Sequence, residues 1–96
     1  MKQLFLTVYT YKEHLDEVAL RELTKRFGEV GESSGTLAHY TRLDGRGGFT
    51  VSELAEEHQQ AAVFETILAY GPWIDFEIIP VTTMAEALPS ILKLYG

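Results

Sequence analysis

Three features of the sequence predict an α+β fold in which two helices cover one face of an antiparallel sheet. The chain has 96 residues, which suffice for one small domain over residues 1–96. Hydrophobic residues make up 46% and charged residues 23%, as in globular proteins. Strand-like and helix-like segments follow one another in the order β-α-β-β-α-β-α. Split β-α-β units in this order form the ferredoxin-like fold, for which we predict the strand order 4-1-3-2.

A strand, a helix and a loop fill the first third of the chain. Val, Tyr, Phe and Thr are frequent in Gln3–Tyr11, which is typical of a strand. Apolar residues recur at helical spacing over Glu13–Phe27, and Gly28 follows where a glycine ends many helices. Glycine and serine mark Glu29–Gly35 as a loop.

The next two strands form a hairpin. We predict these strands over Thr36–Leu43 and Gly48–Ser52, on either side of the turn Asp44–Gly47. The Asp-Gly pair accepts the positive φ of a tight turn. A two-residue turn would place His39 opposite Ser52 on the neighbouring strand.

The second helix is predicted from Glu53 or Leu54 to Tyr70, and the fourth strand over Trp73–Thr82. Pro80 lies in that strand and cannot donate a ladder hydrogen bond, so an edge position is expected.

A third helix should follow the fourth strand. Thr83 and Glu86 have the spacing of a capping box at its start. Pro89 lies inside this helix, where we expect a kink or a restart.

Alternation along the strands divides the side chains of the sheet into two sets. We expect the purely apolar set to face the helices. Its members are Leu4, Leu6, Val8, Ala38, Tyr40, Phe49, Val51, Ile74, Phe76 and Ile78. The other set, expected on the open face, is mixed and contains Phe5, Thr7, Tyr9, Tyr11, Leu37, His39, Thr41, Thr50, Ser52, Glu77 and Ile79. Because a monomer would expose this semi-apolar face, we predict a homodimer that packs two sheets face to face and buries more than about 1,000 Å².

A candidate ligand site follows from the same face assignment. His39 would be its polar centre, because a neutral imidazole can act as a base near pH 7. The predicted ligand-binding residues are Tyr9, His39, Thr41, Thr50 and Ser52. The alternative is that His39 and Ser52 form a buried polar pair that satisfies itself, with no ligand.

The second half of the chain resembles a family of small bacterial proteins of unknown function, the DUF3303 type. The resemblance rests on Asp44-Gly45 and Gly48-Phe49 in the hairpin, on Glu53, on the string Trp73–Val81, and on Glu86-Ala87. That family is similar to dimeric α+β barrel proteins, a group that includes cofactor-independent monooxygenases and isomerases. The resemblance therefore implies this fold and a dimer, and it implies no particular catalytic residue.

Composition and charge exclude several classes of function. The chain has no cysteine, and its net charge is −6. The acidic balance argues against nucleic acids and anionic membranes as partners. His14 and His58 have no metal-ligand spacing, so we predict neither a metal nor a cofactor. The apolar run Leu4–Val8 is too short for a signal peptide, and we expect a cytoplasmic protein.

Two functions remain open at this level. The first is a binding protein for a small apolar or aromatic molecule, or a cofactor-independent enzyme that acts on one. The second is a non-catalytic homo-oligomeric interaction module whose cavity is filled by side chains. A cavity above about 300 Å³ around Tyr9 and His39 would favour the first function.

Overall fold

The computed structural model describes residues 2–32 and 35–96, so Met1 and the predicted loop residues Ser33 and Ser34 lie outside the described residues. The strands are β1 (Lys2–Tyr11), β2 (Thr36–Thr41), β3 (Gly47–Ala55) and β4 (Ile74–Val81). The helices are α1 (Glu17–Val30), the short 3₁₀ helix η1 (Glu56–His58), α2 (Gln59–Tyr70) and α3 (Met84–Tyr95). The predicted α+β class and the order of elements are confirmed.

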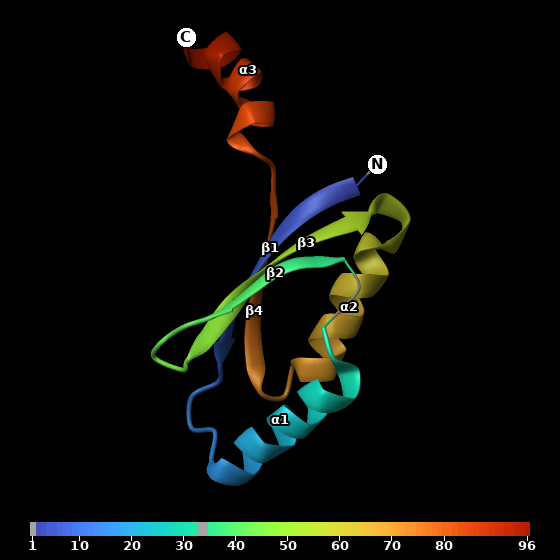
Figure 1. Ribbon diagram of the computed structural model, residues 1–96, viewed down its shortest axis with the longest axis vertical. Coiled ribbons are helices and arrows are strands. Elements are labelled where there is room, and N and C mark those ends of the chain that lie inside the picture. Colours follow the sequence, from blue (N-terminus) through green and yellow to red (C-terminus); the bar gives the residue numbers. More distant parts are fainter. Residues whose placement is uncertain (1, 33–34) are drawn as a thin grey trace.

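The four strands form one antiparallel sheet, and α1 and α2 lie on the same side of it (Figure 1). The strand order is β2-β3-β1-β4, which reads 4-1-3-2 from the β4 edge. Pro80 therefore lies in an edge strand, opposite Phe5 of β1, where a missing donor is tolerated.

The ends of α1 differ from the prediction by three or four residues. The helix begins after Asp16, whose carboxylate accepts a hydrogen bond from the backbone N–H of Ala19 at 2.8 Å. It continues through Gly28 and ends at Gly31, which has φ 70° and donates its N–H to the Phe27 carbonyl at 2.7 Å. Gly31, whose φ lies in the left-handed region, therefore ends the helix as expected for a C-terminal cap. Gly28, where the helix was predicted to end, lies inside it.

The hairpin between β2 and β3 has a longer loop than predicted. The backbone N–H of Arg42 donates to the Gly47 carbonyl at 2.8 Å, and the Asp44 carboxylate accepts from the N–H of Arg46 at 3.0 Å. This closed loop shifts the predicted register by two residues. His39 consequently lies opposite Thr50, and the predicted pairing of His39 with Ser52 was wrong.

The third strand is longer than predicted, and α2 starts later. Leu54 and Ala55 continue β3 by pairing with Gln3 and Lys2 of β1. The chain then passes through η1 before α2 begins at Gln59. The predicted helix start at Glu53 or Leu54 was wrong because those residues complete the central ladder of the sheet.

The register of β1 reverses the predicted faces of three strands. Tyr9 lies opposite Gly48 of β3 and opposite Phe76 of β4, so Tyr9 and Phe76 share a face. This face looks toward the helices, because the same cavity is lined by Tyr9, Phe76 and α1 residues such as Phe27. The assignment for β4 was correct. That for β1, β2 and β3 was wrong, and His39 points into the helix layer.

The open face of the sheet carries many of the apolar side chains. By register these are Leu4, Leu6, Val8, Ala38, Tyr40, Phe49, Val51, Ile79 and Val81, and the same face carries Thr10, Glu53, Asp75 and Glu77. Tyr40 is 59% exposed and Phe49 is 38% exposed, with ring centroids 5.3 Å apart. The sheet face predicted to be purely apolar is therefore not, for β1, β2 and β3, the face that α1 and α2 cover.

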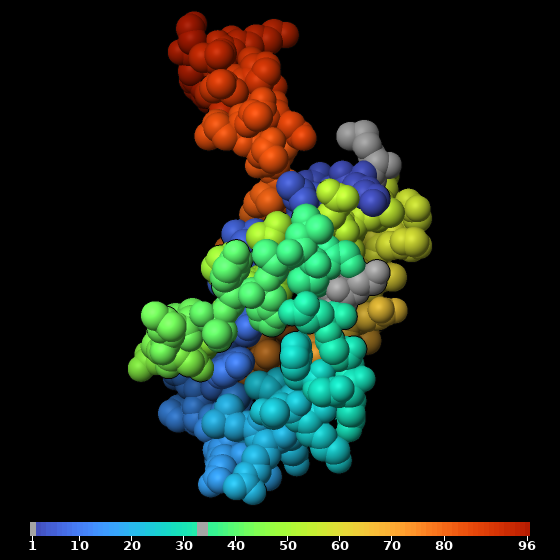
Figure 2. Space-filling view, viewed as in Figure 1, coloured from blue at the N-terminus to red at the C-terminus, as the bar shows by residue number. Residues whose placement is uncertain are grey.

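Helix α3 stands away from the rest of the domain, roughly in line with β4 (Figures 1 and 2). Thr83 caps it by accepting from the N–H of Glu86 at 3.2 Å, while the Glu86 carboxylate accepts from the Thr82 hydroxyl at 2.9 Å. The predicted cap is therefore present, although Glu86 bonds the Thr82 side chain. The helix runs through Pro89 as one element, so the predicted restart does not occur.

Two adjacent glycines allow β1 and β3 to approach. Gly47 has φ 155°, and a Cβ atom there would lie 2.1 Å from the Tyr9 carbonyl oxygen. At Gly48 a Cβ atom would lie 2.6 Å from the Tyr9 hydroxyl oxygen, because the Tyr9 ring crosses this position. The glycines therefore make room for both the backbone and the phenol of Tyr9.

We expect Gly47→Ala to destabilise the protein by at least about 1–3 kcal/mol, because both the φ angle and the steric contact oppose a side chain there. Gly28→Ala is the matched control. It lies inside α1 with no atom within 4 Å of a Cβ, and it should stabilise the protein by about 0.4–1 kcal/mol. Chemical denaturation measures both effects, and equal effects of the two substitutions would contradict the strand packing described here.

Candidate functional site

A cavity of about 810 Å³ lies between the sheet and the helices α1 and α2. Among the described residues, Leu23 of α1 and Ile74 of β4 are the only buried large apolar side chains, and they are still 7% and 8% exposed; both line this cavity. Further lining residues on the sheet are Phe5, Thr7, Tyr9, Tyr11, His39, Thr50, Ser52, Phe76 and Ile78. Further lining residues on the helices are Leu20, Thr24, Phe27, Ala62, Val63, Thr66, Ala69 and Tyr70. The centre of this domain is thus a largely apolar space with hydroxyl groups on its walls.

A chain of three polar side chains reaches into this space. The Tyr9 hydroxyl lies 2.6 Å from Nε2 of His39, and Nδ1 of the same imidazole lies 2.7 Å from Oε1 of Glu32. The His39 ring meets the Tyr9 ring edge-on, with centroids 5.6 Å apart, and the Phe27 ring of α1 at 6.3 Å. His39 is therefore held between the central strand β1 and the helix layer.

The partners of His39 fix its tautomer. A carboxylate only accepts hydrogen bonds, so Nδ1 carries the proton that is donated to Glu32. In the neutral imidazole Nε2 is then an acceptor, and the Tyr9 hydroxyl donates to it. The hydrogen bonds thus run from the Tyr9 phenol through the His39 imidazole to the Glu32 carboxylate, and each donor faces an acceptor.

Burial raises the pKa of the Tyr9 phenol, and the neighbouring Tyr11 and Glu32 raise it further. The phenol consequently stays protonated near neutral pH and keeps its role as donor to His39. Its oxygen still has lone pairs with which to accept a hydrogen bond from a bound molecule.

The structure brings together four of the five predicted ligand-binding residues. Tyr9, His39, Thr50 and Ser52 all line the cavity, and Thr50 pairs with both Thr7 of β1 and His39 of β2. Thr41 does not line it. It lies beside the hairpin loop, where its hydroxyl donates to the Gly47 carbonyl at 3.2 Å.

The location of this site differs from the prediction. We expected these residues between two sheets of a dimer, and that expectation was wrong, since the residues face α1 and α2 of their own chain. The cause is the register of β1, which places Phe5, Thr7 and Tyr9 on the helix side.

Sequence reasoning missed Glu32 and Phe27 as neighbours of His39. Glu32 follows Gly31, whose positive φ turns the chain out of α1 toward β2. The direction of that turn depends on tertiary packing, and no periodic pattern in the loop reports it. Phe27 lies four residues after Leu23 in the predicted helix, and this helical spacing is the one available signal for a contact with the sheet.

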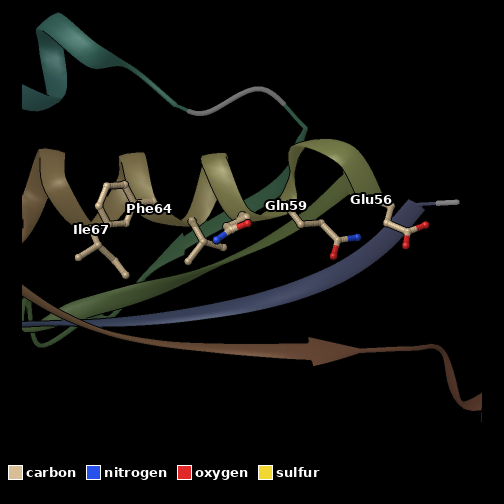
Figure 3. Close-up of a pocket in the computed structure, with 6 residues that line it drawn as sticks. Glu56, Gln59, Phe64 and Ile67 are labelled. Atoms are coloured by element: carbon tan, nitrogen blue, oxygen red, sulfur yellow. The ribbon is translucent and has the colours of Figure 1, made fainter.

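A second, shallower hollow lies along α2 (Figure 3). Side chains of η1 and α2 alone line it, and Glu56, Gln59, Phe64 and Ile67 mark its length. It contains no histidine, and Phe64 is 61% exposed. The cavity with the Tyr9–His39–Glu32 chain is therefore the better candidate site.

Residues 2–32 and 35–96 contain neither a cluster of potential metal ligands nor a helix that could span a membrane. Within these ranges, no three His, Asp or Glu side chains gather as potential metal ligands. No helix in the described part of the chain is long and apolar enough to cross a membrane.

Comparisons with known proteins identify a family and no activity. No curated protein matches the chain. A structural relative is the NE2512 protein of unknown function from Nitrosomonas europaea, which is 17% identical, with a TM-score of 0.48 over 86% of this chain and 92% of that one. Residues 3–95 match the family described as a domain of unknown function, DUF3303, which extends the resemblance of the second half to nearly the whole chain. The protein therefore belongs to the DUF3303 family.

Proposed function

We propose that this protein binds a small apolar or aromatic molecule in the cavity between its sheet and its helices. The observation that carries the proposal is a space of about 810 Å³ that holds one organised polar chain, Tyr9–His39–Glu32, within mainly apolar walls. Sites for small molecules commonly have 300–1,000 Å³, apolar walls and a few polar groups that fix orientation.

The hydrogen-bonded side chains Tyr9, His39 and Glu32 also support a second form of this proposal, in which the protein is a cofactor-independent enzyme. A bound molecule that hydrogen-bonds to the Tyr9 oxygen can pass its proton to that oxygen while the phenol proton moves to Nε2 of His39. The products are a ligand anion and an imidazolium that Glu32 stabilises. No electrons are exchanged, so the step needs no redox partner.

Filling the cavity tests the proposal. Ala62 lines it from α2, whereas the adjacent Ala61 is exposed and does not. We expect Ala62→Trp to weaken binding of Nile red, a neutral apolar dye, by at least about tenfold, or about 1.4 kcal/mol, because the indole occupies the space.

The control Ala61→Trp should bind the dye as the unchanged protein does, in the same fluorescence titration. Equal affinities of both variants, or no binding by the unchanged protein, would refute the proposed cavity site.

A homodimer that packs two open sheet faces together, as in dimeric α+β barrels, is the second proposal. Three strands contribute Val51, Leu6 and Ile79 in one row across this face, and the next row contains Phe49 and Val8. No helix of the described residues covers them, because α1 and α2 lie on the other side of the sheet and α3 stands away from it. Large exposed apolar patches on monomers are uncommon. If the protein is a non-catalytic interaction module, the open face of the sheet is the only surface that this function requires.

Helix α3 supports a second copy as the partner. Its exposed apolar residues are Met84, Leu88, Ile91, Leu92, Leu94 and Tyr95. The two-residue link after β4 and the cap at Thr83 direct the helix away from its own sheet. A stable interface buries roughly 800 Å² per subunit, and we expect these side chains and the open face to supply it together.

We expect the unchanged protein to have twice the single-chain mass of 10.8 kDa in light scattering at micromolar concentration. Val51→Glu should shift it to the monomer, because two carboxylates would be buried without partners in the centre of the interface.

Gln60→Glu adds the same charge on the exposed side of α2 and should leave the dimer intact. A monomer for the unchanged protein, or dissociation by both substitutions, would contradict this interface.

The expected surroundings follow from charge and composition. A net charge of −6 favours neither nucleic acids nor anionic membranes as partners. A chain without cysteine fits the cytoplasm, which is the compartment that we infer.

A further inference from the structure

The side chains that line the cavity carry an uneven set of charges. The described lining residues include Glu32, Glu53 and Glu65 and no lysine or arginine, and the Glu53 side chain lies on the open face because Glu53 pairs with Leu4. The lining histidines are His39, whose Nδ1 bonds Glu32, and His58, which is exposed. An anionic ligand would meet the Glu32 carboxylate there and no lysine or arginine, while losing its hydration. Carboxylates and phosphates are therefore poor ligands for this cavity.

A cationic ligand is disfavoured for a different reason. Glu32 already accepts from His39 at 2.7 Å, and Glu53 forms an ion pair with Lys2 at 3.5 Å. Glu65 is exposed at the outer side of the cavity, so solvent screens its charge. None of the three carboxylates offers a buried, unpaired partner that would offset the desolvation of a cation.

The donor and acceptor roles of Tyr9, His39 and Glu32 specify one property of the ligand. The Tyr9 hydroxyl uses its proton toward Nε2 of His39, so toward the cavity it presents oxygen lone pairs. A bound group that points at Tyr9 must then donate a hydrogen bond. A group that can only accept would have to break the 2.6 Å contact between Tyr9 and His39 to obtain a donor.

We propose that the cavity selects an uncharged, mainly apolar molecule with a single O–H or N–H donor, such as a phenol or enol, and that Tyr9 accepts this donor while His39 and Glu32 hold the phenol in place. This inference rests on the proposed function and names the ligand class for the same site. Tyr9 acts on the ligand directly, whereas His39 and Glu32 are positioning residues.

Three naphthalene derivatives share one apolar ring system and differ in charge and in whether they carry a hydrogen-bond donor. 2-Naphthol is neutral with a donor, 2-methoxynaphthalene is neutral with an acceptor only, and 2-naphthoate is an anion. Calorimetric titration at pH 7 should show 2-naphthol binding about tenfold more tightly than 2-methoxynaphthalene, the value of one hydrogen bond. 2-Naphthoate should bind at least about tenfold more weakly than 2-methoxynaphthalene.

Tyr9→Phe should abolish the preference for 2-naphthol and leave the affinity for 2-methoxynaphthalene within about threefold, which also shows that the variant is folded. The control is Tyr40→Phe, the same substitution next to His39 but on the open face of the sheet. It should retain the full preference.

The outcomes distinguish this inference from the proposed function. Equal binding of the two neutral compounds, or strongest binding of 2-naphthoate, overturns the ligand class while an apolar binding site stands. A preference that survives in Tyr9→Phe overturns the role of Tyr9. Failure of all three compounds to bind overturns the proposed function and this inference with it.

Discussion

Tyr9 lies between Gly48 of β3 and Phe76 of β4, and this register of β1 determines the character of both faces of the sheet. A slip by one residue would exchange the two faces completely. In the observed register, the phenol crosses Gly48 and reaches His39 on β2, so that three strands meet at one hydrogen bond. The loop after α1 then adds Glu32. The fold and the candidate site therefore both depend on the pairing of β1 with β3 and β4.

The helices of the described residues leave two apolar regions of the domain unfilled or uncovered. Inside, Leu23 and Ile74 are the only buried large apolar side chains among the described residues, and a cavity lies between the sheet and the helices. Outside, the open face and α3 expose further apolar side chains. Burial of apolar surface is the main favourable contribution to folding, so occupation of either region should stabilise this small protein. A ligand and a second subunit would then both contribute to stability by mass action.

The sequence predicted the class of fold and the order of the elements, and four of the five predicted ligand-binding residues line the cavity. Periodicity and turn residues are local signals, and they located most elements to within a few residues. The faces of β1, β2 and β3 could not be derived in the same way, because both sides of this sheet carry apolar and polar side chains and alternation alone does not say which side the helices cover. The hairpin register failed because Asp44 and Gly45 also fit a longer loop. Glu32 depends on a turn at Gly31 whose direction only the folded chain sets.

The central claim is that the side of the sheet with Tyr9 and His39 faces the chain's own helices. The nuclear Overhauser effect between the ring protons of His39 and those of Phe27 tests it most directly, since these rings meet edge-on with centroids 6.3 Å apart. Our account predicts this cross-peak within a single chain, together with one between His39 and Tyr9. Cross-peaks from His39 to the methyl groups of Leu6 and Val51, with none to Phe27, would place His39 on the open face and contradict the account.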